Sequence, residues 1–168
     1  MRLKGEYRLS EDPEESKLQI ENDLRNIAQA VNGVITEFTP TLYGSVTAGT
    51  FTYTSASTSG WYLRQAQMID FWFSVVWVGM SGPPVGNLQM SLPLRTWFSN
   101  FDFWAGSVMS SNVSFANASD TFCIPVAVNN SYDCEFVSGR HNAASGKVQV
   151  QTAGSLIGHI RYLGQPKQ

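Results

Sequence analysis

The sequence predicts a mostly β protein: a jelly-roll-like antiparallel β-sandwich preceded by a short N-terminal α-helix. Three observations lead to this prediction. Apolar and polar residues alternate through most of the chain after residue 34, turn-forming residues separate the alternating runs, and a segment with helix start and stop signals comes before them. A chain of 168 residues is expected to form one main domain.

The chain divides into two parts of unequal charge. Residues 1–37 hold eight of the thirteen acidic residues and five of the eleven basic residues, so the remainder is poor in charge. We place the boundary at Asn32-Gly33. The predicted divisions are an extended arm (1–12), a short coiled-coil helix (13–33) and the β-sandwich (34–168). The arm is polar and without pattern, and is expected to order on a partner.

The helix has recognisable ends. Asp12 is placed to cap it, Pro13 suits the first helical position, and Glu15 completes a capping box. Asn32-Gly33 is a typical stop. These signals predict a helix from about residue 13 to residue 32.

One face of this helix is apolar at heptad spacing. The predicted seam consists of Ile20, Leu24, Ile27 and Val31, and Val34 would continue it. Two interpretations are open: the seam packs on the chain's own sandwich, or it packs against sister helices. We favour sister helices, because the β region has enough apolar residues to fill its own core and a helix of this length is marginal alone. Ile and Val in the seam favour more than two strands, and we expect a homotrimer.

The longest predicted strand has the sequence MIDFWFSVVWVGM, residues 68–80. Asp70 inside the run and Gly82-Pro83-Pro84 after it leave too short an apolar stretch for a membrane helix, so no membrane insertion is expected. At period two, one face is wholly apolar and belongs in the core. The other face is mixed but too apolar for full exposure, which predicts a subunit interface at Trp72, Val76 and Val78.

The rest of the β region alternates in the same way, which predicts eight to ten short strands. Residues that share a face are Phe51 with Tyr53; Leu88, Met90 and Leu92; Phe122, Ile124, Val126 and Val128; Tyr132, Cys134 and Phe136; Val148 and Val150; and Leu156, Ile160 and Tyr162. Cys123 and Cys134 flank a predicted hairpin and could face each other across it, and we expect them to be reduced rather than bonded.

No motif for catalysis, metal binding or a cofactor is visible. The acidic residues and the two histidines, His141 and His159, are scattered, and Asp133 and Glu135 are best explained as a solvated strand face. A net charge of -2 and the lack of a basic stripe argue against nucleic acid as partner. We therefore expect a protein that is not an enzyme and needs no cofactor.

The stretch RTWFSNFDFWAG, residues 95–106, is rich in aromatic side chains. Exposed aromatic rings stack on sugars or anchor protein interfaces. The alternative is that these rings plug the sandwich or the seam between subunits. The candidate receptor or interface residues are Trp97, Phe98, Phe101 and Trp104.

The region from residue 38 to residue 93 resembles a module found in structural proteins of tailed bacteriophages. The residues that carry the resemblance are Thr39-Pro40-Thr41, Gly44, Gly49, Tyr53, Gly60, Tyr62, Leu92 and Pro93. The module usually has a glycine soon after its Tyr strand, where this chain has Gln65-Ala66-Gln67, so that turn is expected to differ. The helical segment also resembles short helices that precede such modules.

The resemblance implies a homotrimeric virion protein, assembled in the cytoplasm of the host bacterium. Its N-terminal arm would bind other virion proteins of the capsid, neck or tail. One implied role is that of a short fibre or spike that attaches to the host surface, with a surface glycan as a candidate receptor. The other is that of a capsid decoration or cement protein without a receptor. A carbohydrate-active enzyme on the virion is a third, weaker option.

Overall fold

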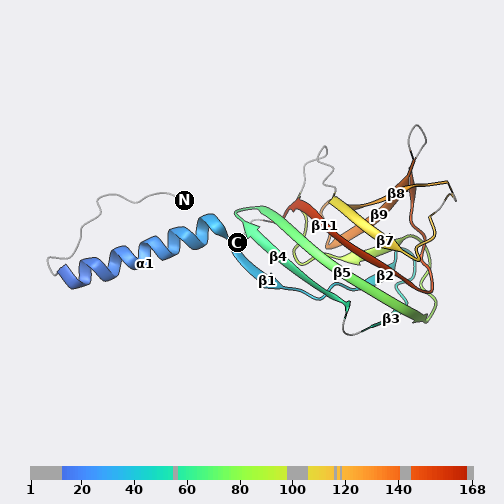
Figure 1. The fold of residues 1–168 in the computed structure, drawn as a ribbon, viewed down its shortest axis with the longest axis horizontal. Coiled ribbons are helices and arrows are strands. Elements are labelled where there is room, and N and C mark those ends of the chain that lie inside the picture. The colour runs from blue at the N-terminus through green and yellow to red at the C-terminus, as the bar shows by residue number, and fades with distance from the viewer. Residues whose placement is uncertain are drawn as a thin grey trace.

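The structure is a computed structural model that describes residues 13–54, 57–97, 106–115, 117, 119–140 and 145–165. The described residues form one helix and eleven strands (Figure 1). They are α1 (Pro13–Asn32), β1 (Val34–Glu37), β2 (Leu42–Gly44), β3 (Thr50–Tyr53), β4 (Ser59–Gln65), β5 (Met68–Ser81), β6 (Leu88–Ser91), β7 (Gly106–Ser111), β8 (Phe122–Ala127), β9 (Asp133–Gly139), β10 (Gly146–Lys147) and β11 (Gly154–Leu163). The predicted arm, residues 1–12, and the capping residue Asp12 lie outside this range.

The strands form two antiparallel sheets. Sheet A has the order β1-β4-β5-β11-β7, with β3 also pairing with β5, and sheet B has the order β10-β9-β6-β2, with β8 pairing with β9. The predicted antiparallel β-sandwich is thus confirmed. The described strands are more numerous than the eight to ten short strands that the sequence predicts. Two of them are also long: β5 has 14 residues and β11 has 10.

The core lies between the two sheets and depends mainly on β5. As the alternation predicted, its inner face is buried from Ile69 to Trp77, at Ile69, Phe71, Phe73, Val75 and Trp77. From sheet B, Leu88, Met90, Cys134 and Phe136 meet it. The rings of Phe73 and Phe136 lie 6.3 Å apart in an edge-to-face arrangement, which ties the two sheets together.

The β8–β9 hairpin shows where alternation was insufficient. Phe122, Ile124 and Val126 share a face as expected, but the core takes the other face of β8, with Cys123, Pro125 and Ala127. In the hairpin register Cys123 lies opposite Ser138, and Cys134 lies opposite Ala127. The two cysteines therefore do not face each other as predicted, and both are free thiols.

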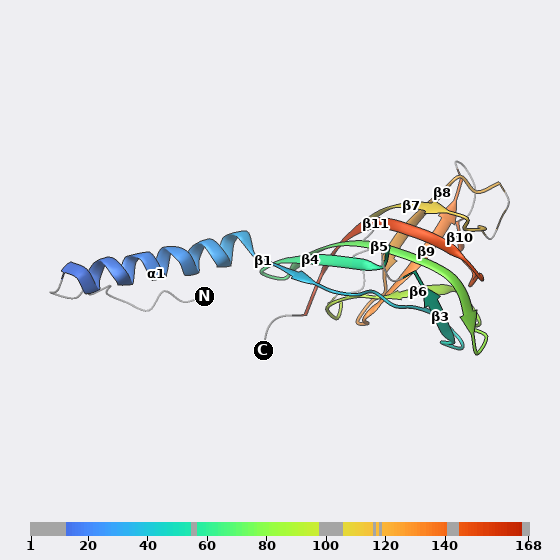
Figure 2. The same ribbon diagram turned by 60° about the horizontal axis from the view of Figure 1, so that its bottom comes forward.

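The helix ends where the sequence predicted, and the chain turns at Gly33. Gly33 has a φ of +72°, which an L side chain rarely adopts, so the helix stops at Asn32. Val34 opens β1, opposite Arg64 of β4, and the prediction that it continues the helical seam is wrong. The helix projects away from the sandwich along the long axis of the molecule (Figures 1 and 2).

Candidate interaction surface

The projecting helix carries exposed apolar side chains. Leu18 is 60% exposed, Leu24 is 61% exposed, and Ile20 is also exposed. The side chains of Ile27 and Val31 lie outside the described part of the structure. The principal contact of α1 with the sandwich is with β4, where the helix leads into β1. The described seam residues, Ile20 and Leu24, are therefore not packed on the chain's own sandwich. This disfavours the first of the two interpretations of the seam.

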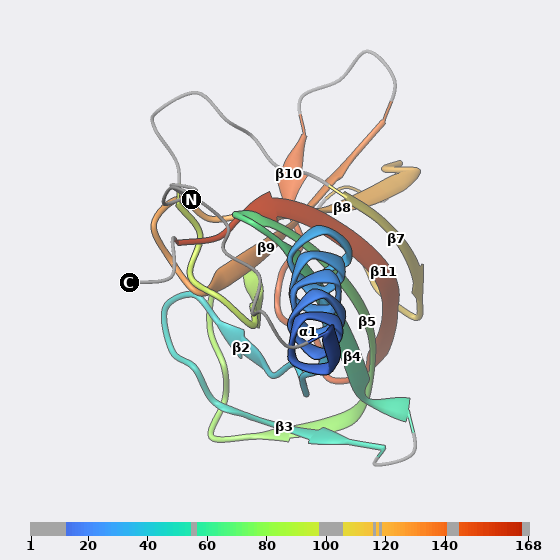
Figure 3. The same cartoon turned by 90° about the vertical axis from the view of Figure 1, so that its left-hand side faces the viewer.

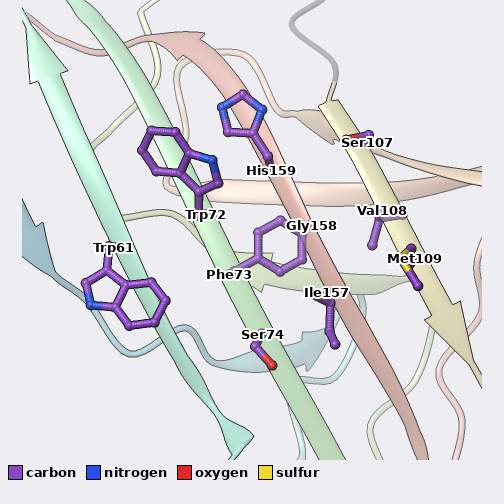
Figure 4. A pocket seen from close by; sticks show the side chains of 10 residues that line it. All are labelled: Trp61, Trp72, Phe73, Ser74, Ser107, Val108, Met109, Ile157, Gly158 and His159. Carbon is purple, nitrogen blue, oxygen red and sulfur yellow. The ribbon is translucent and has the colours of Figure 1, made fainter.

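A second apolar surface covers the outer face of sheet A. Strand pairing places Trp61 of β4 directly opposite Trp72 of β5, and Trp72 opposite His159 of β11. Ser107 of β7 follows in the same row. Figure 4 shows the side chains of Trp61, Trp72 and His159 presented on this face by three neighbouring strands. Residues distant in sequence thus meet because β11 inserts between β5 and β7.

The face is hollowed into a shallow open groove. The groove has a volume of about 400 Å³ and is lined by residues from β4, β5, β11 and β7. Its rim includes Trp61, Trp72, Ile157 and Met109, all of them exposed. An exposed apolar patch of this kind on a folded protein usually marks an interaction site.

A buried carboxylate organises the polar side of the groove. Asp70, which is 3% exposed, accepts hydrogen bonds from Nε and Nη2 of Arg161 at 2.7 and 3.0 Å, and its Oδ1 lies 3.0 Å from Nε2 of His159. Burial alone would raise the pKa of Asp70, but the hydrogen bonds from Arg161 and His159 outweigh burial and lower this pKa. The imidazole of His159 is also stacked on Trp72, with ring centres 5.0 Å apart and planes at 32°. The result is a cluster in which one buried carboxylate contacts two basic side chains.

No local pattern in the sequence predicts this cluster. His159 lies on the outer face, opposite Trp72, and in the sequence it is one of several scattered polar residues. The pairing joins residues 89 and 91 positions apart, which no local pattern reveals. The available signal was Asp70 itself, since an aspartate inside a strongly apolar strand predicts a charged partner.

The three predicted interface residues all belong to the outer side of β5. Trp72 and Val78 are exposed, and Val76 is partly buried. The pairing of β5 with β3 passes from Trp77 to Gly79, so Val78 is the extra residue of a bulge. Trp72 therefore belongs to the groove and Val78 to a separate irregular end of the strand, and the subunit interface stays a prediction.

The aromatic segment is only partly described. Trp97 is exposed, and its backbone N–H donates to the carbonyl of Leu163 at 2.8 Å. Phe98, Phe101 and Trp104 lie outside the described residues, as does His141. The predicted receptor site in this segment therefore stays a prediction.

The carboxylates of β9 have structural partners. Asp133 accepts hydrogen bonds from the hydroxyls of Tyr43 and Ser131, and burial together with Asp133 raises the pKa of Tyr43. Glu135 lies 2.6 Å from Nζ of Lys147 and accepts from Gln89. Within the described ranges, no cluster of three or more His, Cys, Asp or Glu side chains is placed to bind a metal ion. The described helix is not apolar enough to cross a membrane.

Comparison with protein-family profiles finds no family that matches the chain, and comparison with curated proteins finds no match either. Among solved structures, the chain is similar to the crystal structure of Dettilon tailspike protein (gp208), with 18% sequence identity and a TM-score of 0.47. The likeness covers 76% of this chain and 23% of the tailspike chain, so the chain spans less than a quarter of that neighbour. A likeness at this level assigns no function.

Proposed function

We propose that the chain is a non-enzymatic structural protein of a tailed-phage virion. In this proposal it is a homotrimer, held to the particle by its N-terminal arm, and it displays the sandwich on the particle surface as a short fibre or spike. The main observation in support of this assembly is the projecting helix. Ile20 and Leu24 of the predicted seam face solvent on a helix with little support from its own domain, and sister helices would bury them.

The phage assignment is supported by the residues that resemble the virion module, because they form one structural unit. Tyr53 accepts a hydrogen bond from the backbone N–H of Leu42, directly after Thr39-Pro40-Thr41, at 2.6 Å. Gly60 lies where a Cβ atom would come within 2.7 Å of the ring of Phe71, so the core requires a glycine there. The matched residues thus have a common role in joining β2, β3, β4 and β5.

The test is to locate the protein on particles. Antibodies raised against the sandwich should label a discrete position on tailed-phage particles from cells that carry the gene, and mass spectrometry of purified particles should detect the chain. If particles contain none of the chain, the proposal is wrong.

Particles made without the gene distinguish the two structural roles. A loss of adsorption to host cells with intact, stable heads supports a fibre or spike that attaches to the host. Normal adsorption combined with heads or necks that break under heat or low salt supports the decoration role instead.

A further inference from the structure

The groove on the outer face of sheet A combines two exposed indole rings with a row of polar groups. Trp61 is 45% exposed and Trp72 is 42% exposed, and strand pairing places them directly opposite each other on neighbouring strands. His159 of β11 and Ser107 of β7 follow in the same row. Figure 4 shows this row crossing the sheet from Trp61 to Ser107. Apolar rings and hydrogen-bonding groups therefore lie side by side on one face.

The hydrogen bonds of the Asp70 cluster leave part of its polar capacity unused. Arg161 lies two residues from His159 on the same face of β11, and its side chain is 57% exposed. It binds Asp70 through Nε and Nη2, and its Nη1 group has no acceptor within the described part of the chain. Nε2 of His159 lies 3.0 Å from the carboxylate of Asp70, which accepts hydrogen bonds, so Nε2 carries the proton and Nδ1 of the neutral imidazole is an acceptor. The cluster therefore offers both a donor and an acceptor beside Trp72.

These two kinds of group match the chemistry of a sugar. A sugar ring presents an apolar C–H face that stacks on an aromatic ring, and hydroxyl groups at its edge that both donate and accept hydrogen bonds. A carboxylate only accepts, so it would leave Nδ1 of His159 without a partner. A wholly apolar surface would cover the unused groups of Arg161 and His159 without hydrogen-bonding them, which costs free energy. A polyhydroxylated ligand satisfies the rings and the polar groups together.

The charges around the groove favour a neutral sugar over an acidic one. No lysine or arginine is among the described residues that line the groove, and the charge of Arg161 at its edge is balanced by Asp70. Glu37, exposed on β1, pairs with Trp61 and adds a carboxylate beside that indole. An acidic sugar would therefore meet a negative charge without an unbalanced positive one. Nucleic acid is disfavoured for the same reason, because its binding depends on cationic side chains that neutralise phosphates.

The shape and position of the groove suit a stretch of a polymer. Its volume of about 400 Å³ lies within the range of small-ligand sites, yet the groove is open to solvent. The described lining comes from strands and includes no residue of α1. Figure 3, a view along the helix, shows β4, β5, β11 and β7 following one another on one side of the molecule, with β2 and β9 on the opposite side. The groove thus lies on the side of the projecting head, where a glycan chain can pass across it.

We propose that this groove binds a neutral glycan. The rings of Trp61 and Trp72 stack on sugar faces, and Arg161 and His159 form hydrogen bonds with sugar hydroxyls. The inference rests on the attachment role in the proposed function and deepens it, because it names the class of receptor and the surface that contacts it. It assigns this contact to sheet A and not to the aromatic segment around Trp97.

Binding of the full chain to a glycan array tests the proposal. The array carries neutral polysaccharides of bacterial cell surfaces, together with acidic polysaccharides that contain uronic or sialic acids. We expect binding to at least one neutral glycan and weaker or no binding to the acidic ones. Binding confined to acidic glycans, or binding to no glycan, overturns the proposal.

A matched set of variants tests the location of the site. Trp72→Ala and Trp61→Ala each remove a ring from the groove, whereas Trp97→Ala removes a ring that is similarly exposed, at 47%, and lies outside the groove. For the neutral glycan that binds best, we expect each groove variant to raise the dissociation constant about tenfold or more, and Trp97→Ala to change it less than about twofold. Isothermal titration calorimetry measures the constants, and urea denaturation checks that each variant keeps its fold. Equal effects of all three, or a loss in Trp97→Ala alone, overturn the proposal.

The Leu24→Asp chain, in which the helical seam is disrupted, tests whether a second copy covers the groove instead. It should bind a soluble oligosaccharide of the same glycan as tightly as wild type does, and bind more weakly only to an immobilised polymer, because avidity is lost. If this variant binds the oligosaccharide and the wild-type oligomer does not, another copy covers the groove and the proposal is wrong.

The outcomes also separate this inference from the proposed function. If particles contain the chain but the chain binds no neutral glycan, the glycan site is wrong and the virion role stands. If the chain binds a neutral glycan through Trp61 and Trp72 but is absent from particles, the virion role is wrong and the glycan site stands.

Discussion

The two faces of β5 differ in what they do for the molecule. Its inner side chains, Ile69 to Trp77 at every second position, are buried and define the sandwich. Its outer side chains begin with the buried carboxylate of Asp70 and continue with exposed Trp72 and half-buried Ser74 and Val76. One strand therefore supplies both the core of the fold and a surface that the fold does not need. The comparison teaches that apolar content alone does not distinguish core from interface; pairing and exposure do.

The two faces of β5 should differ most in the stability that is lost when an aromatic ring is removed from each of them. Phe71→Ala removes a fully buried ring that packs edge-to-face on Phe38 with centroids 5.6 Å apart. We expect it to lower the free energy of unfolding by about 3–5 kcal/mol. Trp72→Ala is the matched control and should cost less than about 1 kcal/mol. Both are measured by urea denaturation in the Leu24→Asp background, so that assembly does not contribute. Equal losses would show that Trp72 belongs to the core.

Glycine substitutions sharpen the same comparison. A Cβ at Gly60 would lie 2.7 Å from the ring of Phe71 and 2.9 Å from the carbonyl of Phe38, whereas one at Gly79 would lie 3.8 Å from its nearest neighbour. We expect Gly60→Ala to destabilise by about 1–3 kcal/mol through overpacking. Gly79→Ala should be within about 0.5 kcal/mol of wild type. Thermal denaturation of both variants checks this, and similar melting temperatures would contradict the close packing at Gly60.

The smallest change is expected at Asp70, the buried member of the outer face. Asp70→Asn keeps the shape but removes the charge that Arg161 and His159 contact, and should lower the free energy of unfolding at neutral pH by about 1 kcal/mol. The pKa of Asp70 is lowered in the folded chain, so its stabilising contribution is complete above the ordinary aspartate pKa of about 3.9. It is lost as the pH falls through the lower pKa of the folded state.

Urea midpoints of wild type and Asp70→Asn should therefore differ at pH 7 and converge once the pH falls below the lowered pKa of Asp70. A difference that persists unchanged in acid would show that the side chain acts through its shape and not its charge.

The sequence predicts the structure correctly where the relevant pattern is local. The buried face of β5 follows from its alternation, and the helix end follows from Asn32-Gly33, where the backbone needs a positive φ. It was insufficient for β8, because both faces of that strand carry apolar residues and only packing selects Cys123 and Ala127 for the core.

Pairing between strands that are distant in sequence explains the features that the sequence did not predict. The groove and the Asp70 cluster exist because β11 lies between β5 and β7, and strands so distant in sequence carry no mutual signal in a single chain. Ile157 and Met109 were not predicted to lie beside Trp72 for the same reason. Trp72 was predicted, because a large aromatic residue on the mixed face of a core strand is visible locally.

The central claim is that the helix assembles the molecule while the sandwich folds without it. Sedimentation equilibrium of the full chain at micromolar concentration, with and without Leu24→Asp, tests this most directly. We predict a wild-type mass three times the 18.6 kDa of one chain. The Leu24→Asp chain should lose this assembly and its helical circular dichroism but keep the melting transition of the sandwich, because three carboxylates cannot be buried together in an apolar seam. A wild-type mass of one chain, or joint loss of the helix and the sandwich transition in the variant, would contradict the account.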